Sequence, residues 1–133
     1  MMIEIITKLS VYLTSIIFGI MLFFSFVVAP VTFTALNEEN ARKFIRKLFP
    51  YYYTINLTIS VLVLILFIIL KIFSLDFYII LSVAVLFAVS NFILMPLINK
   101  FRDEKQNKKF KQSHFVSVVI NFVQMILLVI VLI

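Results

Sequence analysis

Four long hydrophobic stretches alternate with short polar segments along the chain. The stretches cover approximately residues 5–29, 51–70, 77–98 and 115–133. Each is close to the ~20 residues that an α-helix needs to cross the ~30 Å hydrocarbon core of a bilayer. The pattern therefore predicts one all-α domain over residues 1–133, an integral membrane four-helix bundle with four spans.

Residues between and within the stretches predict where the helices bend and begin. Pro30 and Pro96 fall near one end of the first and third spans, and each is expected to distort its helix because proline has no backbone N–H. Asn37 is a favoured N-cap residue, with acidic residues directly after it and basic residues later. Residues 37–48 are therefore expected to form a short interfacial helix between spans one and two, and Pro50 to restart the chain as the second span.

Composition agrees with a protein that faces lipid. Hydrophobic residues make up 64% of the 133 positions and charged residues only 14%, which leaves too little polar surface to cover a water-soluble globule. The chain has no cysteine, so disulfides, thiolate metal sites and thiol redox chemistry are excluded.

The basic residues are concentrated in two loops. All Lys and Arg residues except Lys8 and Lys71 lie in residues 37–49 and 100–113. Because positively charged short loops stay in the cytoplasm, both loops are predicted to be cytoplasmic, and the chain is predicted to be N-out and C-out in the inner (plasma) membrane. Anionic headgroups of the lipid bilayer are the expected partners of these loops. Nucleic acid is not expected, since topology already accounts for the net charge of +6.

Polar side chains inside the spans fall on single helix faces. Their spacing is i, i+3, i+7 and i+10 in the fourth span and i, i+4 and i+8 in the second. Lipid offers such groups no hydrogen-bond partner, so they are expected to face the protein interior in the half of the bundle nearest the basic loops. They are Ser25, Tyr52, Asn56, Ser60, Ser90, Asn91, His114, Ser117, Asn121 and Gln124.

Two interpretations of this polar layer stay open. Hydrogen bonds between membrane helices commonly serve packing alone, at ~0.6 kcal/mol on average in one membrane protein. Convergence of polar groups from four helices also fits a ligand pocket. In either case Asn121 is expected within hydrogen-bond reach of Asn56, Ser60, Ser90 or Asn91. No catalytic residue is predicted, because no carboxylate lies inside a span and no nucleophile and base share a suitable spacing.

His114 is the only histidine and the one candidate for a metal or haem ligand. Met95 lies at comparable depth and is a conceivable second ligand. A simpler interpretation is a neutral ring that is hydrogen-bonded to a loop carbonyl or to Asn99, because a protonated imidazole would oppose the helix dipole at the start of span four. No cofactor is therefore predicted. A haem- or metal-dependent membrane redox protein that uses His114 is the alternative.

Several short motifs occur in a set order along nearly the whole chain. They are Gly19, Ser25 to Phe33 around Pro30, Leu48 to Tyr52 around Pro50, Met95 to Asn99 with Arg102 and Asp103, and Phe110 before His114, Ser117 and Asn121. Together they resemble the transmembrane protein 205-like domain-of-unknown-function family. The resemblance implies a four-span bundle and little established biochemistry; eukaryotic relatives are linked to cisplatin resistance. Thiol-based handling of a soft metal does not transfer, because cysteine is absent.

The short loop between spans three and four is expected to bring Asn99, Arg102 and Asp103 beside His114. Arg102 and Asp103 then form either a cap over a pocket or a surface ion pair. We therefore expect a non-enzymatic accessory or small-ligand-binding bundle; a homo-oligomer or a membrane-protein partner stays open. The candidate pocket residues are Ser25, Asn56, Ser60, Ser90, Asn91, Asn99, His114, Ser117 and Asn121.

Overall fold

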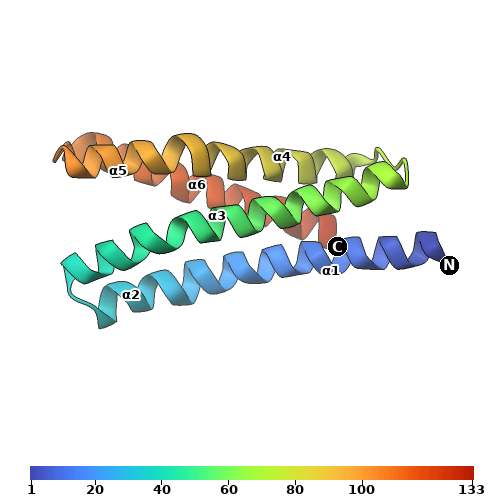
Figure 1. Cartoon of the computed structure of the whole chain (residues 1–133), viewed down its shortest axis with the longest axis horizontal. Coiled ribbons are helices and arrows are strands. Elements are labelled where there is room, and N and C mark those ends of the chain that lie inside the picture. Colours follow the sequence, from blue (N-terminus) through green and yellow to red (C-terminus); the bar gives the residue numbers. More distant parts are fainter.

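The computed structural model describes residues 1–133 as helices joined by short connections, without strands (Figure 1). The helices join into four rods, each long and apolar enough to cross a membrane. Each predicted hydrophobic stretch lies in one rod. The elements are α1 (Met2–Phe23), the π-helical turn η1 (Phe24–Val28), α2 (Ala29–Ala35), α3 (Glu38–Ile69), α4 (Leu75–Val89), the π-helical turn η2 (Ser90–Leu94), α5 (Met95–Asp103) and α6 (Asn107–Leu132).

The rods form two helical hairpins that pack into a four-sided bundle. α3 packs against α1 and α4, and α6 packs against the same two helices from the other side. The connections 36–37 and 104–106 lie at one end, called the basic end below, whereas residues 70–74 and the amino terminus lie at the opposite end (Figure 1). Figure 1 also shows that α3 and α5 are farther apart at the basic end than α3 and α4 are at the opposite end.

Each proline that was expected to distort a span lies two residues after the end of a π-helical turn. The N–H of Ala29 bonds to the carbonyl of Phe24, and the N–H of Met95 bonds to the carbonyl of Ser90, five residues back in both cases. Pro30 and Pro96 come one residue later. The extra residue in each turn widens the helix just where proline removes a donor, so rods one and three continue past their prolines.

The separate interfacial helix predicted over residues 37–48 is wrong. These residues are the first turns of α3, which runs without interruption through Pro50. The cap itself forms as expected, since the Asn37 side chain accepts a hydrogen bond from the N–H of Asn40 at 2.9 Å. Ala41 and Ile45 are only 0% and 8% exposed. Burial of this face within the bundle outweighs the single intrahelical hydrogen bond that Pro50 removes.

The core changes in character along the bundle. Toward the end opposite the basic loops its fully buried side chains are mainly aliphatic and include Ile17, Val63, Ile80, Val83 and Leu128, with Phe67 and Phe77 packed against them. Toward the basic end the packing becomes aromatic. There the rings of Phe24 and Tyr52 stack with centroids 4.2 Å apart, and those of Phe49 and Tyr53 at 5.5 Å. Many other large apolar side chains lie on the outside of the bundle, as a lipid-facing surface requires.

Candidate functional site

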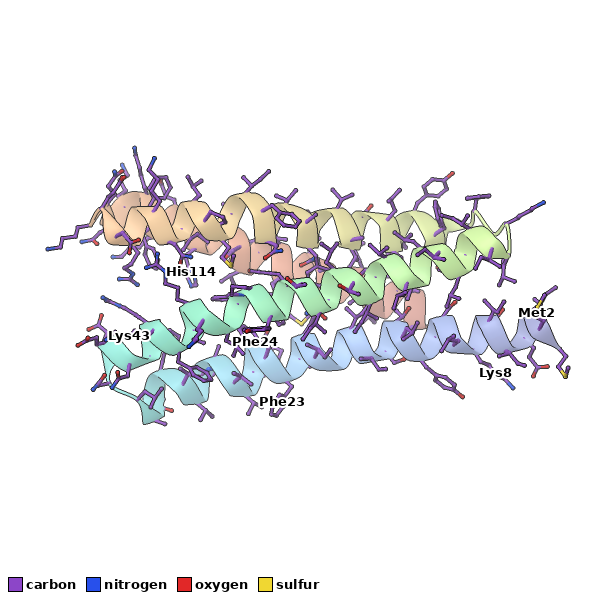
Figure 2. The ribbon with its side chains drawn as sticks, viewed as in Figure 1. Met2, Lys8, Phe23, Phe24, Lys43 and His114 are labelled. Atoms are coloured by element: carbon purple, nitrogen blue, oxygen red, sulfur yellow. The ribbon has the colours of Figure 1, made fainter.

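A cleft of about 640 Å³ lies between the two hairpins at the basic end. One wall comes from α2 and α3, and the other from α5 and α6; Figure 2 marks Lys43 and His114, one from each wall. Apolar side chains make up much of both walls, while charged side chains cluster toward the loops. The apolar and aromatic lining comprises Phe33, Ile45, Phe49, Tyr53, Met95, Ile98 and Phe110; the polar lining comprises Asn37, Glu38, Glu39, Arg42, Lys43, Arg46, Asn99, Arg102, Asp103, His114 and Ser117.

An ion pair crosses the cleft from one hairpin to the other. Both terminal nitrogens of Arg46 donate to the two carboxylate oxygens of Asp103, each at 2.7 Å. These bonds hold the pKa of Asp103 below its ordinary value. Arg102 and Asp103 both line the cleft, as the cap hypothesis requires, but Asp103 pairs with α3 rather than with Arg102. Successive side chains on a helix point about 100° apart, which separates these two neighbours.

Arg102 differs from the other cations of the cleft because it forms no ion pair. Arg42 pairs with Glu38, and Lys43 pairs with Glu39. The guanidinium carbon of Arg102 instead lies 3.8 Å from the centroid of the Phe110 ring. Partial burial, followed by the nearby charge of Arg42, lowers the pKa of Arg102. It remains a cation, since arginine stays protonated across the physiological range.

His114 stacks on the same aromatic ring. Its imidazole is nearly parallel to Phe110, at 4° with centroids 5.8 Å apart. Burial, and then the charge of Arg102, lowers the pKa of His114, which favours the neutral form of the ring. The hydrogen bond expected to Asn99 or to a loop carbonyl does not form, although Asn99 lines the same cleft. Met95 lines it too, but no three His, Cys, Asp or Glu side chains converge anywhere in the chain.

Hydrogen bonds connect three rods about one helical turn beyond Ser117, on the side of the cleft away from the basic loops. The Tyr52 hydroxyl donates to Asn121 Oδ1 at 2.7 Å, and Asn121 Nδ2 donates to Ser25 Oγ at 2.9 Å. Asn121 therefore joins different spans as predicted, but its expected partners were wrong. Tyr52 and Ser25 are the partners of Asn121 instead. The Tyr52 ring stacks on Phe24, which precedes Ser25 in the sequence, so both side chains lie near Asn121.

The remaining polar residues of the predicted layer lie in the packed interior. Asn56, Ser60, Ser90 and Asn91 are buried and do not line the cleft. Asn56 donates to the Tyr52 carbonyl at 2.9 Å, and Ser60 donates to the Asn56 carbonyl at 2.8 Å, so both bond within α3. Asn99, His114 and Ser117 are the predicted pocket residues that line the cleft itself.

Sequence reasoning missed the wall that α3 contributes. Arg42, Ile45, Phe49 and Tyr53 all line the cleft and are spaced i, i+3, i+7 and i+11, which is one helical face. This spacing is visible in the sequence only if the helix is continued through Pro50. If Pro50 is taken to separate two helices, Arg42, Ile45 and Phe49 belong to one helix and Tyr53 to the next, and the common face is not recognised.

The fold and the cleft together define a class: a four-span, all-α membrane protein with a polar-ended cleft between two helical hairpins. Within that class, the chain belongs to the family described as a domain of unknown function, DUF4149, whose profile matches residues 12–107. The match includes the first basic loop, the first part of the second and most of the cleft, but it ends before Phe110 and His114. No curated protein and no solved structure matches the chain. The narrower resemblance to the transmembrane protein 205-like family stays a prediction.

Proposed function

We propose that this protein is a non-enzymatic ligand-binding bundle of the inner membrane, whose cleft holds a small amphipathic molecule. The observation that carries the proposal is the cleft of about 640 Å³, which combines apolar walls with polar groups gathered at one end. Its volume lies within the ~300–1,000 Å³ typical of small-molecule sites, which likewise pair apolar linings with a few placed polar groups.

The basic loops support a cytoplasmic location for this cleft. They carry nearly all of the positive charge in short connections, the feature that orients membrane proteins with those loops inside the cell. The amino and carboxyl termini would then lie outside. The opposite half of the bundle is filled by aliphatic side chains such as Val63, Ile80 and Leu128, all fully buried. A cleft that ends halfway favours binding over conduction through the bundle.

Two serines on α6 offer a matched test. Ser117 lines the cleft and Ser113 does not, and each hydroxyl bonds back to a carbonyl of its own helix. Mass spectrometry of small molecules that co-purify with the protein should detect a bound compound in the wild type and in Ser113→Phe. Ser117→Phe should lack it, because the larger ring projects into the cleft and takes space that the ligand needs. Identical compounds in all three proteins would contradict the proposal.

The same samples test the redox alternative. A visible absorption spectrum and metal analysis of the purified wild type should give neither a haem band nor stoichiometric metal. A haem band that is lost in His114→Ala would instead assign the cleft to a redox cofactor.

A further inference from the structure

The charges around the cleft are unevenly matched. Three of its four cations, Arg42, Lys43 and Arg46, are each paired with one carboxylate. Arg102 has no such partner, although it lines the same cleft and is partly shielded from solvent. The paired groups cancel one another, so the cleft retains one uncompensated positive charge, at Arg102.

Two neutral hydrogen-bonding side chains accompany this charge. Asn99 precedes Arg102 by three residues on α5 and therefore lies on the same helix face. His114 approaches from α6 by stacking on Phe110, the ring that also carries the Arg102 guanidinium. The Phe110 ring contacts the guanidinium carbon of Arg102, and no carboxylate accepts from the guanidinium N–H groups, which are therefore available to an added acceptor. A phosphate matches this arrangement, since guanidinium groups bind phosphate oxygens in a bidentate manner.

The rest of the cleft is built for hydrocarbon. Phe33, Phe49, Met95 and Ile98 line it, and they come from three of the segments at the basic end. Phe33 is also 56% exposed, so this apolar wall continues onto the outer surface of the bundle, where lipid chains lie. A free phosphate would leave most of the 640 Å³ unused and the apolar walls in contact with water.

We infer that the cleft binds one membrane phospholipid, with its phosphate held by the Arg102 guanidinium beside Asn99 and His114 and its upper acyl chains against Phe33, Phe49, Met95 and Ile98. The location agrees with this occupant, because the cleft lies where the hydrophobic stretches give way to the basic loops, at the depth of the headgroups. This inference rests on the proposed binding function and specifies the ligand.

Native mass spectrometry of the full chain in a neutral maltoside detergent tests the inference with three probes: dioleoylphosphatidylglycerol, dioleoylglycerol and inorganic phosphate. The phospholipid should bind as a single copy, whereas the other two should bind at least about tenfold more weakly, since each lacks half of the interactions. Arg102→Gln should weaken phospholipid binding by about tenfold or more, and Arg102→Lys, which keeps the charge, by less.

Lys100→Gln is the matched control. It removes the same charge from the same helix outside the cleft, and it should change binding by less than about twofold. Equal losses in Arg102→Gln and Lys100→Gln would overturn the inference, because binding would then follow loop charge alone. The inference would also be overturned if dioleoylglycerol bound as tightly as the phospholipid and Ser117→Phe abolished that binding. The proposed ligand-binding function would stand in that case. If Ser117→Phe alters the binding of no probe, both the inference and the proposed function fail.

Discussion

The two halves of the bundle use the same four rods in different ways. In the half opposite the basic loops, Val63, Ile80, Val83 and Leu128 are fully buried and the rods pack without a large cavity. In the basic half the hairpins separate and enclose a cleft (Figure 2). Buried, mainly aliphatic side chains pack closely and fill the first half, whereas charged and polar side chains line the opening in the second half together with aromatic ones.

The change between the halves coincides with the two π-helical turns. Ser25, within η1, accepts the hydrogen bond from Asn121 just beyond the cleft, and η2 ends directly before Met95, which lines the cleft. A π turn widens a helix and changes the direction of the next helical segment. A proline comes shortly after each turn and keeps that segment from resuming ideal α-helical bonding. The sequence thus loosens rods one and three at the same level, which allows the hairpins to diverge there.

The largest effect on the free energy of unfolding is expected in the closely packed half of the bundle. Ile80→Ala leaves a cavity in the closed half, where Ile80 is 0% exposed, whereas Ile126→Ala trims a side chain that is 61% exposed on the outer surface. We expect Ile80→Ala to lower the free energy of unfolding by about 2 kcal/mol, the lower end of the range in soluble proteins, because lipid replaces water as the competing environment. Unfolding in mixed micelles measures both variants. Equal losses would contradict the tight packing of this half.

A smaller effect is expected at the boundary between the halves. Asn121→Leu removes the hydrogen bonds to Tyr52 and Ser25, and should cost about 1 kcal/mol, since such bonds in membranes average ~0.6 kcal/mol each. Tyr52→Phe removes one of the two and should cost about half as much. In the Asn121→Leu background Tyr52→Phe should have little further effect. Full additivity of the two changes in the same unfolding assay would mean that the hydrogen bond between them contributes nothing.

The sequence alone predicts the rods but not how they meet. The four hydrophobic stretches, the Asn37 cap and the distortions at Pro30 and Pro96 are local properties, which composition and backbone chemistry determine. The continuity of α3 through Pro50 depends instead on burial of Ala41 and Ile45 against other helices. The polar stripes predicted an inward layer, yet which residues line the cleft depends on where the rods diverge, and no spacing within one rod encodes that.

The pairing of Arg46 with Asp103 illustrates the same limit and supports the last prediction. These residues are 57 positions apart, and their bond is the ion pair that joins the hairpins across the cleft. Because both side chains are exposed, we expect Asp103→Asn to alter global stability little but to widen the distance distribution between the hairpins. Spin labels on cysteines introduced at Lys47 and Lys100, which lie outside the cleft in a chain without native cysteine, measure that distance.

The pH dependence of this distance has a defined sign. The pKa of Asp103 is lower in the folded protein than its ordinary value of 3.8, so the carboxylate remains charged and paired at any higher pH. The wild-type distribution should therefore be the same at neutral pH as in mild acid, and should broaden toward that of Asp103→Asn only as the pH falls through the lowered pKa. Asp103→Asn should be broad throughout and independent of pH. Broadening of the wild type well above 3.8 would assign the response to His114 or to another group, and would remove Arg46 and Asp103 as the link between the hairpins.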